Sequence, residues 1–110
     1  AAHNSRNSLN WQGTYTGVTP CADCEGIKVQ ITLSDSTYQA SYLYIGHEED
    51  GATQISGKFS WDSTDGAIIL ENTVFPPYYK VGENRLIQLD MEGNPITGEL
   101  ADMYVLTKTE

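Results

Sequence analysis

Apolar and polar residues alternate with a period of two along most of this chain. No stretch keeps the period of about 3.6 residues that an amphipathic helix requires. Successive side chains of a strand point to opposite faces, so the alternation predicts strands that each bury one face. The clearest case is residues 26–33, where isoleucine, valine, isoleucine and leucine alternate with lysine, glutamine and threonine. The sequence therefore predicts an all-β protein.

Short turns rich in glycine, asparagine, aspartate and proline divide the pattern into segments. We expect about eight strands, at residues 11–18, 26–33, 37–45, 54–62, 67–71, 78–81, 85–91 and 103–108. Gly13 and Gly17 share a face of the first, which predicts tight curvature or close packing there. A closed meander leaves no exposed edge strand, so we predict a small antiparallel up-and-down β-barrel. An open two-sheet sandwich would show the same alternation and is the alternative.

With 110 residues, the chain is long enough for one modest hydrophobic core. We expect residues 1–10, which are polar and do not alternate, to be an N-terminal tether, and residues 11–110 to form the barrel domain. The formal net charge of -9 would repel a phosphate backbone, so we expect no nucleic-acid partner. The longest apolar run, residues 67–70, is too short to span a bilayer. Membrane association would then require a lipid anchor upstream of this sequence.

Cys21 and Cys24 are the two cysteines of the chain, and they lie in a predicted loop beside Asp23 and Glu25. A disulfide between them would close a very small ring and stabilise the fold by only about 2 kcal/mol. A redox couple is disfavoured, because the flanking acids oppose formation of a thiolate. As a metal site, two soft thiolates suit Cu(I), whereas tetrahedral zinc would need two further ligands. An oxidising compartment would close the pair, so copper would bind only to reduced cysteines.

Other side chains could complete a copper site if the fold brought them near the cysteine loop. The candidates are Met91, Met103, His47 and His3. We interpret both methionines as core residues, because methionine commonly fills irregular gaps. His47 lies in the acidic run 46–50, which is typical of a solvated hairpin, and His3 falls in the expected tether.

The aromatic residues could either line a ligand pocket or pack between strands, and packing is the preferred interpretation. They include seven tyrosines: Tyr15, Tyr38, Tyr42, Tyr44, Tyr78, Tyr79 and Tyr104. Trp11, Phe59 and Trp61 belong to the same set. The sequence contains no nucleophile elbow, phosphate-binding loop or histidine metalloprotease motif, so we predict that the chain is not an enzyme.

Residues 13–27 read Gly-Thr-Tyr-Thr-Gly-Val-Thr-Pro-Cys-Ala-Asp-Cys-Glu-Gly-Ile, which resembles the opening of N-terminal domains of NlpE copper-homeostasis lipoproteins. Further matches follow in the same order at residues 37–38, 44–46, 57–61 and 89–96, so the resemblance covers most of residues 11–106. Thr19 departs from the family, in which leucine often precedes the Pro-Cys. The second domain of the best-known members is not in this sequence, so we expect no signalling that depends on it.

The resemblance implies a lipocalin-like barrel, lipid-anchored at the bacterial outer membrane, with roles in copper tolerance and envelope stress sensing. It carries over only Cys21 and Cys24, as a metal or redox pair. An envelope signalling protein is the implied partner, and copper is the implied ligand. The alternative function is a small lipocalin-like carrier of an apolar ligand or lipid, in which the cysteines form a structural disulfide.

Overall fold

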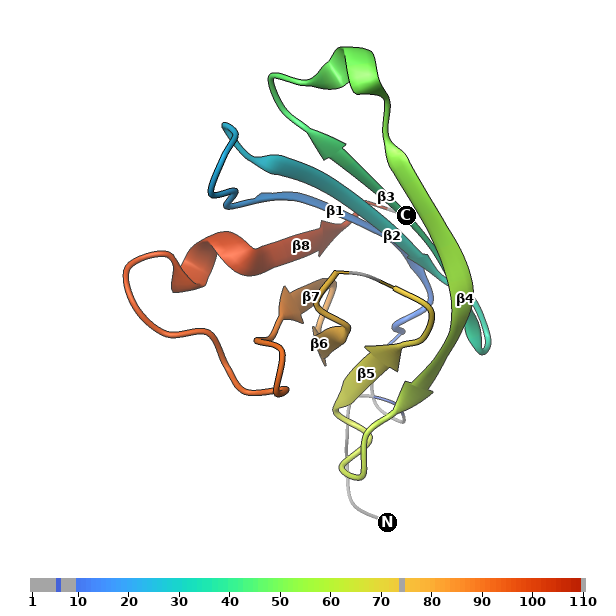
Figure 1. The fold of residues 1–110 in the computed structure, drawn as a ribbon. Helices are drawn as coiled ribbons and strands as arrows, with labels where there is room; N and C mark the ends of the chain where they lie inside the picture. Colours follow the sequence, from blue (N-terminus) through green and yellow to red (C-terminus); the bar gives the residue numbers. More distant parts are fainter. Residues whose placement is uncertain (1–5, 7–9, 74, 110) are drawn as a thin grey trace.

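The computed structural model describes Arg6, residues 10–73 and residues 75–109. Its strands form a closed antiparallel barrel in which each strand pairs with its neighbours in the chain and β8 returns to β1 (Figure 1). The elements are β1 (Gly13–Thr19), β2 (Ile27–Leu33), β3 (Thr37–Tyr44), η1 (Glu48–Asp50), β4 (Thr53–Trp61), β5 (Ala67–Leu70), β6 (Tyr78–Gly82), β7 (Arg85–Gln88), η2 (Ala101–Tyr104) and β8 (Val105–Lys108). The predicted eight-stranded up-and-down barrel is confirmed, and the sandwich alternative is wrong.

The core consists of the inward-facing side chains that the alternation identifies. β1, β2 and β3 pair in long registers, in which Gly13 faces Leu33 and Ile27 faces Tyr44. The buried cluster comprises Tyr15, Val29, Ile31, Leu33, Tyr38, Ala40, Tyr42, Phe59, Ile68, Leu70, Tyr79, Val81, Leu86 and Leu106. Large aromatic and aliphatic side chains therefore fill the barrel interior, which is how a small barrel is normally stabilised. No helix in the described ranges has the length and apolar character needed to cross a membrane.

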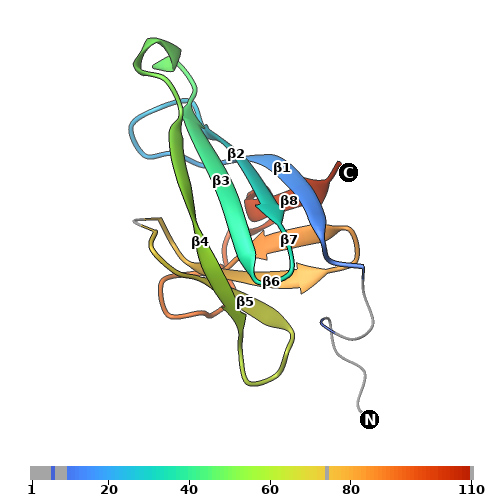
Figure 2. The same ribbon diagram turned by 90° about the vertical axis from the view of Figure 1, so that its right-hand side faces the viewer.

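β4 changes partners along its length. Residues 53–58 pair with β3, whereas only Phe59, Ser60 and Trp61 pair with β5. Figure 2 shows β4 running from β3 at one end of the barrel to β5 at the other. Where β4 no longer pairs with β5, the segment that follows β5 lies against it. The Glu71 N–H donates to the carbonyl of Lys58 (2.9 Å). One end of the barrel is thus partly closed by this segment rather than by a strand.

The last strands are shorter than the sequence predicts. β7 ends at Gln88 and not at residue 91, because Asp90 folds the chain into a turn. The Asp90 carboxylate accepts the N–H groups of Glu92 and Asn94, each at 2.9 Å. The predicted strand 103–108 begins instead with the 3-10 helix η2, and only residues from Val105 onward are strand.

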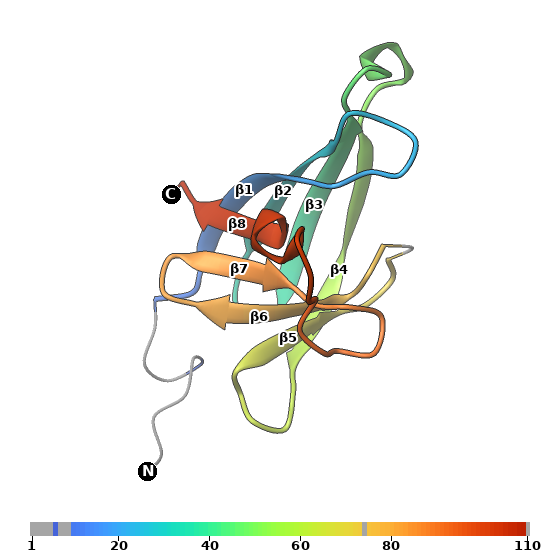
Figure 3. The same cartoon turned by 90° about the vertical axis from the view of Figure 1, so that its left-hand side faces the viewer.

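The barrel closes where β1 meets β8, and Gly17 makes this approach possible. Registered pairing between the two strands is short, with Tyr15 facing Lys108 and Thr16 facing Thr107. A Cβ atom at Gly17 would lie 2.7 Å from the carbonyl oxygen of Val105 and 2.9 Å from Leu106 Cδ2. η2 and β8 lie directly against β1 in Figure 3. The close packing predicted for the glycines of β1 is confirmed at Gly17.

Gly17→Ala is expected to destabilise the fold by about 2 kcal/mol or more, because the added methyl group meets backbone that cannot move without opening the barrel. The control is Gly51→Ala, where no atom lies within 4 Å of the added Cβ and only the positive φ of 78° is strained. That substitution should cost about 1 kcal/mol. Urea unfolding followed by tryptophan fluorescence measures both. A Gly17→Ala cost no larger than that of Gly51→Ala would contradict the closure argument.

Asp62 organises the turn between β4 and β5. Its Oδ1 accepts from the Thr64 hydroxyl (2.8 Å) and N–H (3.1 Å), and from the N–H groups of Gly66 (3.2 Å) and Ala67 (3.3 Å). Burial alone would raise the pKa of Asp62, but these hydrogen bonds to the charged carboxylate outweigh it and hold the pKa below its usual value. The ionised form of Asp62 therefore stabilises the fold.

Asp62→Ala should lower the free energy of unfolding at pH 7 by about 1 kcal/mol, a modest figure because the carboxylate is largely solvated. The pKa is lower in the folded state, so this contribution is complete above the unfolded-state pKa of about 3.9 and is lost as the pH falls through the folded-state value. Urea unfolding at pH 7 and pH 2.5 tests this. An equal difference between the two proteins at both pH values would argue against the charge effect.

Candidate functional site

The cysteine loop, residues 20–26, connects β1 and β2 at the end of the barrel where β4 parts from β5. Cys21 and Cys24 are joined by a disulfide, with their Cα atoms 5.3 Å apart. Both side chains are half-exposed, and the intervening Ala22 and Asp23 are exposed. The sequence left open a disulfide, a metal site and a redox couple, and the structure holds the pair in its oxidised form.

Gly26 fixes the end of the loop. Its carbonyl accepts the backbone N–H of Ile45 at 2.9 Å, which ties the loop to the chain just after β3. A Cβ atom at Gly26 would lie 2.8 Å from Val18 Cγ1, so the loop can turn this closely only with glycine. The Cys24 sulfur lies 3.2 Å from the same carbonyl. A disulfide sulfur has no proton to donate, so this carbonyl becomes a hydrogen-bond acceptor for Cys24 only after reduction.

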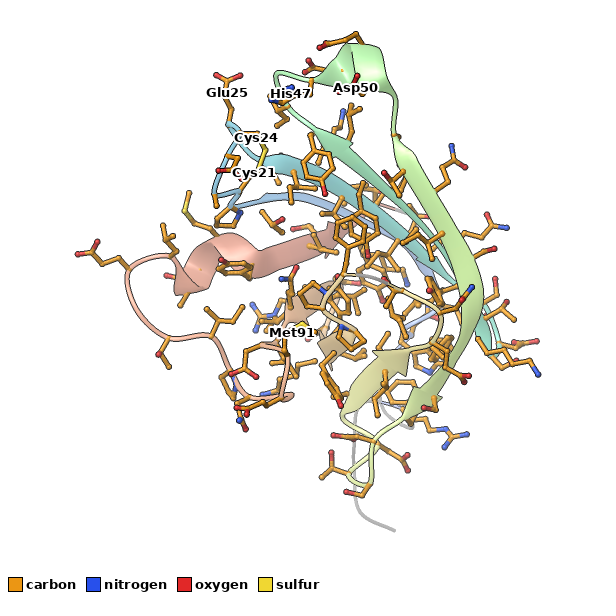
Figure 4. All side chains as sticks on the ribbon, in the orientation of Figure 1. Cys21, Cys24, Glu25, His47, Asp50 and Met91 are labelled. Atoms are coloured by element: carbon orange, nitrogen blue, oxygen red, sulfur yellow. A yellow bond between two sulfur atoms is a disulfide. The ribbon has the colours of Figure 1, made fainter. Side chains whose placement is uncertain are left out.

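An acidic hairpin, residues 46–50, lies beside the cysteine loop (Figure 4). The Glu25 carboxylate borders Gly46, and the N–H of Gly46 donates to Glu48 Oε1 at 3.0 Å. The potential ligand atoms of His47, Glu49 and Asp50 lie within 4.8 Å of one another, but all three side chains are exposed. The solvated hairpin predicted for this run is confirmed, and its negative charge raises the local concentration of cations around the cysteine loop.

The other predicted ligands do not join the cysteines. Met91 is 63% exposed in the turn after β7, and Figure 4 places it well away from the disulfide. Met103 is 55% exposed on η2. The prediction that both methionines pack in the core is therefore wrong, because a turn and a 3-10 helix replace the predicted strand residues at these positions. His3 lies outside the described residues, as do most of the residues assigned to the tether.

Through Pro20 alone, the cysteine loop borders a cavity of about 200 Å³. Pro20, directly before Cys21, lines it together with Tyr42, Phe75, Gln88 and Tyr104. Sequence reasoning missed Phe75 and Gln88 as site residues. The Pro76-Pro77 break signals only that a strand is interrupted near Phe75, and a polar residue such as Gln88 would be expected to face solvent.

The chain matches the model of the NlpE N-terminal domain family over residues 15–99. It belongs to this family. The Escherichia coli (strain K12) lipoprotein NlpE is 33% identical over 88 residues, which cover 78% of this chain and 37% of that protein. This chain thus spans little more than a third of the length of that relative. A second relative, whose structure is solved, is 44% identical to this chain and matches it almost from end to end.

That second relative is a candidate lipoprotein from Shewanella oneidensis, whose crystal structure superposes with a TM-score of 0.88 over 98% of this chain and 97% of the other. The crystal structure of the Escherichia coli NlpE, described as the Cpx pathway activator, superposes with a TM-score of 0.64 at 32% identity. That match covers 79% of this chain and 46% of the solved one. The predicted family and barrel fold are both confirmed.

Removal of the disulfide should lower the free energy of unfolding by only about 2 kcal/mol, because the bond closes a loop of four residues. The oxidised chain is compared in urea with Cys21→Ser/Cys24→Ser and with the chain reduced by a dithiol. The reduced chain and the double variant should agree, since both lack the cross-link. A loss of 4 kcal/mol or more would show that the disulfide is needed mainly for stability.

Proposed function

We propose that this chain is the barrel domain of a bacterial envelope lipoprotein that acts in copper homeostasis and in sensing envelope stress. The half-exposed Cys21–Cys24 pair is the observation that supports this best. A disulfide that served stability alone would gain little from so short a loop and would not need exposure. The proposed function is non-enzymatic, with an upstream lipid anchor placing the domain at the outer membrane.

Copper would bind after reduction of the disulfide. A dithiol reductant would supply two electrons and two protons, which gives two thiols and leaves the reductant as a disulfide. The two thiols then lose their protons to become ligands, and soft thiolates suit Cu(I) at a low coordination number. Asp23 lies between the two cysteines in the chain, and Glu25 and the acidic hairpin lie beside the pair (Figure 4), so these acidic groups favour a cation there.

A signalling role is supported by the similarity of this chain to the Escherichia coli relative. The Escherichia coli relative is described as the Cpx pathway activator, and an envelope signalling protein is the partner that we propose by analogy. The likeness covers 46% of that solved chain, so the shared barrel would contribute only the part of the activity that resides in this domain. The redox state of the exposed loop is the property of this barrel that such a partner could detect.

The reduced chain is expected to bind one Cu(I) ion under anaerobic conditions, measured by competition with a chromophoric Cu(I) chelator. Cys21→Ser/Cys24→Ser should lose at least a hundredfold in affinity, because both soft ligands are removed. The oxidised chain should bind no Cu(I). His47→Ala serves as a control for the acidic hairpin and should retain binding to within about tenfold. The same stoichiometry and affinity in the double variant as in the reduced chain would refute the site.

The cavity beside the cysteine loop favours the carrier as a second candidate function. It holds about 200 Å³, and the buried core fills the rest of the described interior. Pockets that enclose drug-sized ligands measure about 300–1,000 Å³. A carrier built on this barrel would therefore transport a small molecule and not a long-chain lipid.

A further inference from the structure

The cavity at the end of the barrel has a buried floor and a half-exposed rim. Thr19, Val29 and Tyr42 form the floor, each at most 4% exposed. Pro20, Phe75 and Tyr104 contribute to the rim and are half-exposed. These residues come from β1, β2, β3, the cysteine loop, the segment after β5, and η2. A site that is deep at the floor and open at the rim can exchange a ligand with solvent without unfolding.

One wall of the cavity is aromatic. The rings of Tyr42 and Phe75 stack with their centroids 3.8 Å apart and their planes at 12°. Ile27 and Val29 supply aliphatic surface to the same cavity. Aromatic and aliphatic walls of this kind favour an apolar ring, because contact with them removes apolar surface from water.

Two buried hydroxyl groups, on Tyr42 and Tyr79, have no hydrogen-bond partner among the described residues, and of the two residues only Tyr42 lines the cavity. The hydroxyls of Tyr42 and Tyr79 are near each other, and Tyr42 is also near Thr73, but neither hydroxyl forms a hydrogen bond of acceptable geometry with a described residue. Burial raises the pKa of Tyr42, and more strongly that of Tyr79, so both keep their protons in neutral solution. Buried hydroxyls are normally paired, so a ligand that offers a partner to Tyr42 would relieve an unfavourable state.

The cavity does not suit a charged ligand. Its lining consists of threonine, proline, isoleucine, valine, tyrosine, phenylalanine and glutamine, and none of these side chains is charged. An ionised group placed among them would lose its hydration without gaining a counter-charge. The polar side-chain groups of the lining residues are the hydroxyls of Thr19, Tyr42 and Tyr104 and the half-exposed Gln88 amide.

The volume limits the ligand to roughly one substituted ring. A cavity of about 150 Å³ accommodates benzene, so one of about 200 Å³ has room for a ring with a small substituent or a fused five-membered ring. We propose that the cavity is a binding site for a small, uncharged aromatic molecule that carries one hydrogen-bonding group, of the size of phenol or indole. This inference specifies the ligand class of the carrier candidate and is independent of the copper site.

The test is an NMR titration of the oxidised 110-residue chain with phenol, indole, toluene, benzoate and palmitate. Phenol and indole should bind with dissociation constants of about 0.1–1 mM, as expected for ligands of this size. Their ring protons should show nuclear Overhauser effects to the methyl groups of Val29 and Ile27. Benzoate should bind at least tenfold more weakly than phenol because its carboxylate has no partner, and palmitate should not bind because of its length.

Tyr42→Phe isolates the hydrogen bond. The substitution should weaken the binding of phenol three- to tenfold. It should not weaken the binding of toluene, which has no group to pair with the hydroxyl. The matched control is Tyr15→Phe, which removes a buried hydroxyl that bonds to the Trp11 carbonyl at 2.6 Å and lies outside the cavity lining. This control should change neither affinity. Because the Tyr42 hydroxyl has no partner to lose, Tyr42→Phe should fold with its stability kept or increased.

Several results would overturn the proposal. These are no binding of phenol or indole at millimolar concentration, ligand contacts outside the cavity, and benzoate or palmitate binding as tightly as phenol. An equal loss of affinity for phenol and for toluene in Tyr42→Phe would refute the hydrogen bond. The contacts in the unsubstituted chain decide the location even if a variant does not fold. Failure here leaves the copper titration unaffected, because Cys21 and Cys24 do not line the cavity.

Discussion

The structure depends on the close approach of β1 to β8 at Gly17. A β-barrel requires its first and last strands to meet, and here the registered pairing between them is short. The absence of a side chain at Gly17 brings the backbone of Val105 and Leu106 against β1. The same approach places η2 beside the end of β1, where the cysteine loop begins. The position of the loop relative to Tyr104 is therefore a consequence of barrel closure.

The change of partner along β4 determines where the barrel is open. Residues 53–58 pair with β3 but not with β5, so the interior at that end is covered by the segment after β5. Several contacts hold this segment, among them the hydrogen bond that the Tyr38 hydroxyl donates to the Glu71 carbonyl at 2.5 Å and the stacking of Phe75 on Tyr42. Phe75 and Pro76 of this segment line the cavity, which therefore lies at this end of the barrel.

Much of the fold could be predicted from the sequence because burial of one strand face imposes a period of two. β2 shows this most clearly, and its boundary differs from the predicted one by one residue. The face of β7 could not be predicted, since residues 85–91 carry apolar side chains compatible with both registers. Pairing of Leu86 with Val81 settles it and turns Leu86 inward.

The candidate site was less predictable than the fold. The adjacency of Cys21 and Cys24 is local, so the sequence was enough to identify the pair. The cavity combines residues from distant parts of the chain, and no local pattern marks Phe75 or Gln88 as lining residues. Met91 lies in a turn and Met103 in a 3-10 helix. The sequences of this turn and this helix carry no capping signal as strong as the strand pattern around them.

The charge distribution separates the two proposed binding sites chemically. The chain has a net charge of -9, and some of its acidic residues, Asp23, Glu25 and those of the acidic hairpin, lie around the cysteine loop. The lining of the adjacent cavity contains no charged side chain. Negative surroundings disfavour bare thiolates but attract a cation, so the loss of protons from the thiols is favoured only when a metal ion replaces them. This argues for metal binding over thiol–disulfide catalysis at Cys21 and Cys24.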